Sequence, residues 1–149
     1  MATFTSTAAQ TFSNTGFFLA PPKYLEEGVV ARSALYSFTA AQSAGDVIQM
    51  VPVPKGCQII DTLVVFTPGA GGPVLTWIVG DGGSTNRFQT SASATVATTV
   101  HANGGGVGYS YSVDDTIDIT VAAVGSATAA GSVRLTVLYA MDASTDGNS

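Results

Sequence analysis

Charged residues are scarce in this sequence. Only 10% of the 149 residues are Asp, Glu, Lys or Arg, whereas ordinary soluble domains contain about 25%. The five basic residues are scattered, and the formal net charge is −5. Proteins that bind nucleic acids need clustered basic side chains to replace the counterions of the phosphates, and anionic lipid headgroups repel an acidic chain. The composition therefore argues against a nucleic-acid or membrane partner.

Cysteine and long apolar runs are also scarce. Cys57 is the only cysteine, so an intrachain disulfide and a cysteine-based metal cage are excluded. We expect this side chain to be a small, half-buried filler. No apolar run approaches the roughly 20 residues of a membrane span, and residues 1–20 lack the basic start and apolar block of a signal peptide. We therefore expect a protein that is made and used without Sec export.

The abundant residues are small, apolar or hydroxylated. Hydrophobic residues make up 46% of the chain. With so few charges, the exterior must consist of Ser, Thr, Ala and Gly or be covered by other chains. Poorly charged surface is more easily tolerated inside an assembly. This favours an assembling protein, and a Thr-rich all-β monomer is the alternative.

Short segments of strand type alternate with turn signals from Val29 onward, at the spacing typical of a β-sandwich. We predict an all-β fold, an antiparallel β-sandwich of jelly-roll type with about eight strands and no helix. Long glycine-rich connections fit a jelly roll better than a small closed barrel. The predicted strands are 34–38, 47–53, 58–66, 74–79, 87–91, 94–101, 116–124 and 132–140.

Three of these segments indicate their place in a sheet. Pro52 and Pro54 put strand 47–53 at a sheet edge or end the strand there, because proline cannot donate to a ladder. Strand 58–66 is apolar on both faces and should be central, with Ile59, Asp61, Leu63 and Val65 on one face. If the last two strands pair antiparallel, Asp118 and Arg134 form a cross-strand ion pair on the outer face.

The chain divides into three parts: an extended N-terminal arm (1–28), a β-sandwich domain (29–141) and a polar C-terminal tail (142–149). The arm is too polar to fold alone, yet it is rich in aromatic residues. Pro21-Pro22 stiffens its last part. We expect the arm to pack on its own domain or on a neighbour through the residues Phe4, Phe12, Phe17, Phe18 and Tyr24.

Residues able to support catalysis are few. The only histidine, His101, ends a strand, and no serine lies in G-x-S-x-G, so a surface hydrogen bond is favoured over catalysis. Asp114-Asp115 is a poor acid/base pair because neighbours in extended chain point to opposite sides, although Asp81 with Asp115 stays open. The better reading of all three, Asp81, Asp114 and Asp115, is that of turn formers whose carboxylates accept local backbone N–H bonds. We predict no catalytic residue and no enzyme.

The densest motif is the glycine turn that follows the only tryptophan, Trp77. We expect Gly80–Gly83 to supply positive-φ positions. The turn lacks the G-x-x-x-x-G-K pattern of a phosphate loop, and the acidic residues form no D-x-D-x-D-G loop for Ca²⁺. Trp77 with Tyr109 and Tyr111 would suit sugar stacking, but Trp77 fits the core better. We predict no cofactor and no metal.

Phe38–Gly56 reads F-x-x-x-Q-S-A-G-D-V-I-Q-M-V-P-V-P-K-G, and is followed by Q-I-I-D-T-L-V-V-F and V-G-D-G-G-S-T-N-R-F. This succession resembles tailed-bacteriophage virion proteins of the capsid decoration (cement) type. The resemblance covers roughly residues 36–88, and its motifs are turn and strand signatures without a catalytic fingerprint. Thr85-Asn86 stands where an acidic residue is expected before Arg-Phe, which leaves an ion pair of Arg87 open.

The resemblance implies a small β-sandwich on the capsid exterior, made in the host cytoplasm and acting as a homotrimer. Such proteins clamp neighbouring major capsid protein subunits through an extended arm. The arm residues Phe4, Phe12, Phe17, Phe18 and Tyr24 are then the expected partner contacts, unless they cover their own sandwich. A phage tail, fibre or baseplate component is the first alternative, and a carbohydrate-binding module using Trp77 and Tyr109 is the second.

Overall fold

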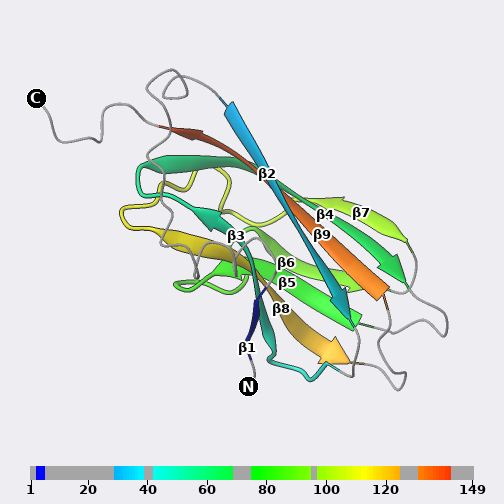
Figure 1. The fold of residues 1–149 in the computed structure, drawn as a ribbon. Coiled ribbons are helices and arrows are strands. Elements are labelled where there is room, and N and C mark those ends of the chain that lie inside the picture. Colours follow the sequence, from blue (N-terminus) through cyan, green and yellow to red (C-terminus); the bar gives the residue numbers. More distant parts are fainter. Residues whose placement is uncertain are drawn as a thin grey trace, which may run out of the picture.

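The computed structural model describes residues 3–5, 29–38, 42–68, 75–94, 97–124 and 131–141 (Figure 1). These residues form nine strands: β1 (Thr3–Thr5), β2 (Val29–Phe38), β3 (Val47–Val53), β4 (Cys57–Pro68), β5 (Leu75–Asp81), β6 (Gln89–Ala94), β7 (Thr98–His101), β8 (Asp115–Val124) and β9 (Gly131–Met141). Within these ranges the chain has no helix, and so none with the length and apolar character to cross a membrane.

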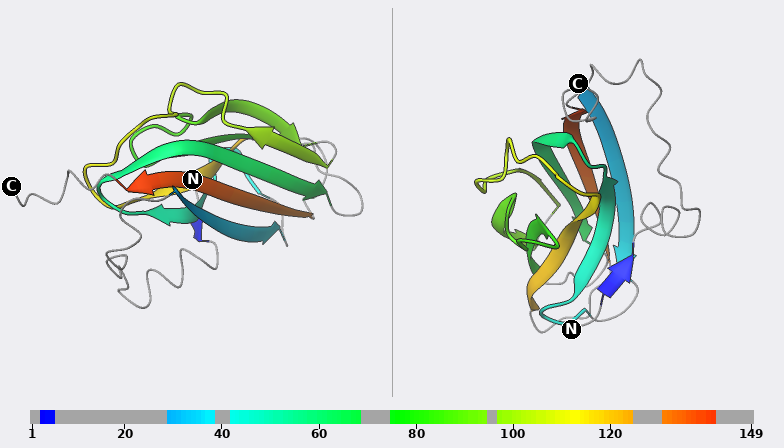
Figure 2. Two further views of the ribbon diagram at one scale, coloured as in Figure 1. Left: turned by 90° about the horizontal axis from the view of Figure 1, so that it is seen from above. Right: turned by 90° about the vertical axis from the view of Figure 1, so that its left-hand side faces the viewer.

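The strands form two layers, a sheet of order β1-β3-β8-β5-β6 and a sheet of order β2-β9-β4-β7 (Figure 2). Apart from β1, the chain is a set of nested antiparallel pairs: β2 with β9, β3 with β8, β4 with β7 and β5 with β6. This is the arrangement of a jelly roll, in which eight strands form two Greek keys. The predicted all-β jelly-roll sandwich is confirmed.

β1 lies parallel to β3, with Thr3 opposite Val47 and Thr5 opposite Gln49. Beyond Gln49, β8 is the one described strand that pairs with β3. Pro52 lies in this second part, where its missing N–H breaks no ladder on the open side. The predicted edge position is therefore confirmed only for the part of β3 beyond Gln49, because β1 covers residues 47–49. The strand ends at Val53, just before Pro54.

The core lies between the two sheets and is built by alternation along each strand. β8 contributes Ile117, Ile119 and Val121, and β9 contributes Val133, Leu135, Val137 and Tyr139, as predicted. At its centre the ring of Phe66 lies 4.9 Å from Trp77 and 6.4 Å from Phe38 between centroids. Trp77 is 2% exposed and Cys57 is 0% exposed, so the expectation of a half-buried Cys57 is wrong.

β4 is central, between β9 and β7, but its predicted faces are wrong at one point. A bulge between Ile59 and Asp61 inserts one residue opposite β9. Because side chains alternate with period two, the extra residue reverses the faces that follow it. Ile59 therefore faces the core together with Thr62, Val64 and Phe66, whereas Asp61, Leu63 and Val65 are more exposed.

The predicted ion pair between Asp118 and Arg134 is also wrong. β8 and β9 lie in different sheets, because the chain crosses from one sheet to the other between them. Asp118 stands opposite Gln49 of β3 and Gly80 of β5 and is 7% exposed. Arg134 is exposed in β9, opposite Leu35 and Val65.

Candidate functional site

The connections β3–β4, β5–β6 and β7–β8 meet at one end of the sandwich, called here the loop end (residues 54–56, 82–88 and 102–114). Backbone hydrogen bonds join them: Gly104 N donates to Phe88 O at 2.8 Å, and Gly56 N donates to Tyr111 O at 2.7 Å. A carboxylate adds a third link, since Lys55 N donates to Asp114 Oδ1 at 2.8 Å. Further side-chain hydrogen bonds at this end include those of Asp81 and Asn103.

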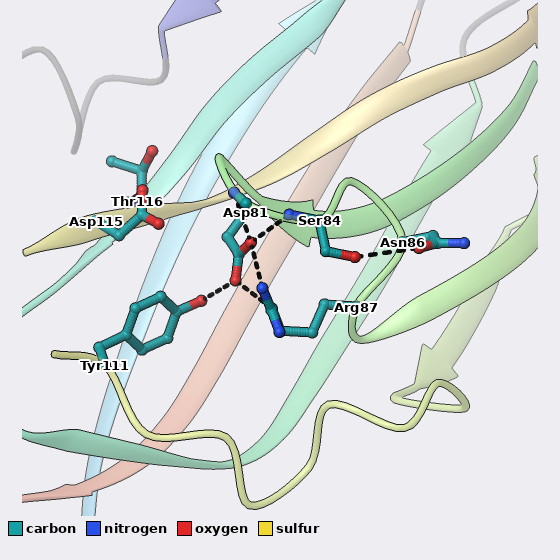
Figure 3. Close-up of polar contacts among 8 residues, drawn as sticks. Asp81, Ser84, Asn86, Arg87, Tyr111, Asp115 and Thr116 are labelled. Carbon is teal, nitrogen blue, oxygen red and sulfur yellow. Dashed lines mark hydrogen bonds and ion pairs between the residues drawn. The ribbon is translucent and has the colours of Figure 1, made fainter. Parts of the chain in front are cut away.

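Asp81 organises the β5–β6 turn (Figure 3). Its Oδ1 accepts hydrogen bonds from the backbone N–H groups of Gly83 at 3.0 Å and Ser84 at 2.8 Å. The backbone closes the same turn, because Asp81 N donates to Ser84 O at 3.0 Å. The prediction that Asp81 is a turn former is confirmed. Asp115 also accepts a local bond, from Thr116 N, but it is the first residue of β8 and not part of a turn. The prediction of a local bond is wrong for Asp114, which accepts from the distant Lys55 N.

Arg87 pairs with this same carboxylate, which settles the question that the sequence left open. Arg87 Nε donates to Asp81 Oδ2 at 2.5 Å, and Nη2 donates to Oδ1 at 3.2 Å. Tyr111 donates its hydroxyl to Oδ2 at 2.7 Å. The guanidinium also lies 3.7 Å from the ring centroid of Tyr109, a cation–π contact. We call Asp81, Arg87, Tyr109 and Tyr111 the loop clasp.

The glycines of the loop end allow backbone segments to pack closely against one another. The prediction that Gly80–Gly83 have positive φ angles is wrong. Gly80, Gly82 and Gly83 are absent from the glycines with positive φ, which in the described residues are 45, 56, 108 and 131. A Cβ on Gly80 would lie 2.0 Å from Ser84 O, so a side chain cannot fit beneath the turn. Gly104 similarly passes against the backbone, with Arg87 O 2.6 Å from a Cβ.

The electrostatics of the clasp favour a charged pair and a neutral phenol. Burial raises the pKa of Asp81, but the hydrogen bonds from Arg87, Tyr111 and Ser84 outweigh it, so that pKa lies below its ordinary value. The bond to Asp81 raises the pKa of Arg87. Burial and then the same carboxylate raise the pKa of Tyr111. The two carboxylate oxygens of Asp81 thus accept five hydrogen bonds. Neither oxygen has a free lone pair with which to act as a base.

Two further carboxylates on β8 lie near the clasp. Burial raises the pKa of Asp115, and burial raises the pKa of Asp118 to about 7. Asp118 Oδ1 is buried without a hydrogen-bond partner in the described part of the chain. In the couple of Asp81 with Asp115, the carboxylate of Asp81 is already engaged by five hydrogen bonds. Over the described ranges, no three His, Cys, Asp or Glu residues are placed to hold a metal ion.

The other sequence candidates lie apart from the clasp. His101 Nδ1 lies 2.8 Å from Asp61 Oδ2, and its side chain is 68% exposed, so the predicted surface hydrogen bond is confirmed. Trp77 is buried, so the alternative of a sugar platform built on Trp77 and Tyr109 is wrong. Tyr109 is 38% exposed, but Arg87 already occupies a position over its ring.

The predicted contact residues of the arm are largely outside the described part. Phe4 lies in β1, opposite Ile48 in the register. Phe12, Phe17, Phe18 and Tyr24 fall outside the described residues. The role of these five residues in partner binding therefore stays a prediction.

Two exposed apolar surfaces were missed by the sequence reasoning. One is the outward face of β2, β9, β4 and β7, here called the open face, which includes Val29 (62% exposed) and Leu35 (44%). The other is the β7–β8 connection, with Val107, Tyr109 and Val113. The signal for the first was the alternation of β2, whose inward Ala34, Tyr36 and Phe38 leave Leu35 on the other side.

Comparison with known proteins shows the same architecture in phage capsid structures. No protein-family model matches the chain, and no curated protein does. A chain of the capsid of Ralstonia phage GP4 matches with a TM-score of 0.71 and 18% identity, over 99% of this chain and 100% of that one. A chain of the cyanophage Pam1 capsid asymmetric unit matches with a TM-score of 0.67 and 23% identity, over 86% of this chain and 95% of that one. A chain of the acidic stable capsid of Helicobacter pylori bacteriophage KHP30 matches with a TM-score of 0.57 and 14% identity, over 76% of this chain and 88% of that one. At these identities the likeness shows the fold, which this chain shares with chains of all three structures.

Proposed function

We propose that this protein is a structural component of a bacteriophage virion that binds the outside of the assembled capsid and stabilises it. The observation that carries the proposal is the likeness to a chain of the Ralstonia phage GP4 capsid, which extends over 99% of this chain and 100% of that one. Two further phage capsid structures contain chains of this fold. The sequence resemblance to decoration proteins, which rests on residues 36–88, supports the same assignment.

The polar residues of the loop end support a structural and non-enzymatic role. The guanidinium of Arg87 and the hydroxyl of Tyr111 both donate hydrogen bonds to the carboxylate of Asp81. Catalytic groups need a free acceptor or donor within reach of a substrate. The hydrogen-bonding groups of these three side chains are instead used in contacts within the protein. A rigid loop end that displays apolar side chains suits a protein that binds other proteins.

The proposed mechanism is burial of weakly charged surface across neighbouring major capsid protein subunits. A protein that binds only the assembled shell stabilises that state by mass action. The arm with Phe4, Phe12, Phe17, Phe18 and Tyr24 supplies the aromatic anchors, through pockets or through strand addition. The homotrimer implied by the resemblance would multiply these contacts.

Capsids that lack this protein provide the test. Purified protein should cosediment with such capsids, remain unbound by unassembled major capsid protein, and raise the temperature at which the capsids release DNA. Cryo-electron microscopy of the complex should place it on the capsid exterior. No cosedimentation, or an unchanged release temperature at saturation, would contradict the proposal, and density on the tail would assign it to the tail, fibre or baseplate instead.

A further inference from the structure

The open face is a four-stranded surface of mostly apolar and weakly polar side chains, with Asp61, Arg134 and His101 as its strongly polar members. Figure 2 (left) shows β2, β9, β4 and β7 side by side. Register places Ala31, Leu138 and Asp61 in one row across three strands, and Leu35, Arg134 and Val65 in another. Three of the exposed large hydrophobic residues of the protein lie on these strands: Val29 (62%), Leu35 (44%) and Ile60 (38%). We propose that a second copy of this chain docks on the open face.

The balance of charges on the open face favours a second copy of this chain as its binding partner. The open face carries one positive charge, on Arg134, and one negative charge, on Asp61, and these cancel, so the whole formal net charge of −5 belongs to the rest of the chain. Two copies therefore meet with the least repulsion if they approach through this face. A strongly basic or acidic partner would gain no complementary field here.

The two charges of the face are also arranged to complement themselves. Asp61 of β4 lies opposite Leu138 of β9. Arg134 lies two outward-facing positions from Leu138 along β9, opposite Val65 of β4. A two-fold axis in the plane of the face, midway between them, places Arg134 of each copy over Asp61 of the other. Such self-complementarity is what an isologous contact requires. The Asp61 carboxylate is oriented on this face by His101 Nδ1 at 2.8 Å and by the backbone N–H groups of Thr62 at 2.8 Å and Ala102 at 3.4 Å.

The size of the face predicts a weak and reversible association. β2, β9 and β4 pair over about ten residues. With strands about 4.8 Å apart and about 3.3 Å of rise per residue, these three strands form a patch of roughly 14 by 33 Å. Two such patches bury on the order of 1,000 Å², the lower limit of specific interfaces. The contact should therefore depend on concentration. It does not rest on the proposed function or on the homotrimer that the resemblance implies.

Sedimentation analysis of the full-length protein between about 1 µM and about 1 mM covers the relevant affinities. The mass should rise with concentration. Leu35→Lys should weaken the association at least about tenfold, since it places an unpaired cation in the contact, and lysine is well tolerated on an edge strand. The matched control is Val113→Lys, because Val113 is 64% exposed on the β7–β8 connection and away from this face. Circular dichroism checks that each variant is folded.

Mixing charge variants tests the two-fold arrangement. Arg134→Glu alone and Asp61→Lys alone should each associate weakly, because like charges then face one another. In an equimolar mixture, the introduced glutamate of one variant lies over the introduced lysine of the other, and the association should recover. A single-copy mass throughout the concentration range, wild-type behaviour of Leu35→Lys, or equal weakening by Val113→Lys would each overturn the proposal. Absence of recovery in the mixture would overturn the two-fold pairing.

Discussion

The carboxylate of Asp81 and the guanidinium of Arg87 stand six residues apart in one turn and form an ion pair, with 2.5 Å between Oδ2 and Nε. The Asp81 side chain is 1% exposed and that of Arg87 is 21% exposed. Because Tyr111 shares the carboxylate and Tyr109 lies against the guanidinium, the pair joins the β5–β6 turn to the β7–β8 connection. The loop end is therefore one cross-linked unit.

Loss of the Asp81 charge should destabilise the protein strongly. Asp81→Asn removes one partner of a buried pair and weakens the bonds to Arg87 and Tyr111, which should cost about 3 kcal/mol of unfolding free energy. Asn86→Ala, an exposed change in the same turn, is the control and should cost less than about 0.5 kcal/mol. Urea unfolding measures both. Similar values for the two variants would show that the clasp is not a stabilising element.

A side chain at position 80 should be tolerated poorly. Gly80→Ala brings a Cβ to 2.0 Å from Ser84 O, so the turn must move. Overpacking of this kind costs about 1–3 kcal/mol. The control is Gly105→Ala, where a Cβ meets nothing within 4 Å. Thermal unfolding should separate the two variants, and an unchanged Tm for Gly80→Ala would contradict this account of the turn.

Asp118 should make the stability depend on pH. Burial raises its pKa to about 7 in the folded protein, against about 3.9 in an unfolded chain. The folded state thus keeps this proton at a pH where the unfolded state has lost it. The stabilisation is complete below the unfolded pKa and is lost as the pH rises through 7. From pH 5 to pH 8 the wild type should lose on the order of 2 kcal/mol more than Asp118→Asn. Parallel urea titrations at the two pH values provide the measurement, and equal losses would be the contrary result.

The thiol of Cys57 should report on unfolding. It is fully buried, and burial raises its pKa to about 12. The thiolate is the reactive form of cysteine, so a disulfide reagent at mildly alkaline pH should leave the native protein unmodified and react rapidly in concentrated urea. Fast reaction in water would show that the β3–β4 corner opens locally.

The sequence allowed the strands and their core faces to be predicted because both depend on local patterns. The alternation of apolar and polar residues along 116–124 and 132–140 identified the inward side chains. Residues typical of turns indicated where the strands end. Pairing could not be predicted in the same way. The same two strands lie in different sheets because β8 finds its partners in β3 and β5, which are distant in the chain. The single-residue bulge at Ile59 likewise leaves no mark in the hydrophobic pattern of β4.

The clasp was only half visible in the sequence. Asp81 was expected as a turn former, but the partner of Arg87 was sought at Thr85-Asn86, directly before it. An aspartate and an arginine that flank a short glycine turn are brought together when the turn closes, so this spacing was the missed signal. Tyr111 and Tyr109 arrive from a connection more than twenty residues further on, and only the fold places them at the turn.

Removal of the aromatic anchors distinguishes the two expected roles of the arm. Phe12, Phe17 and Phe18 are changed together to alanine, with Thr11, Thr15 and Ser13 changed to alanine as the matched control. If the phenylalanines bind the capsid, the triple variant should keep its unfolding free energy within about 0.5 kcal/mol, while its affinity for capsids falls at least about tenfold, because buried aromatic anchors dominate such interfaces. If they cover their own sandwich instead, unfolding should be easier by several kcal/mol, since a buried phenylalanine changed to alanine costs about 3–5 kcal/mol. Full affinity together with full stability would rule out both roles.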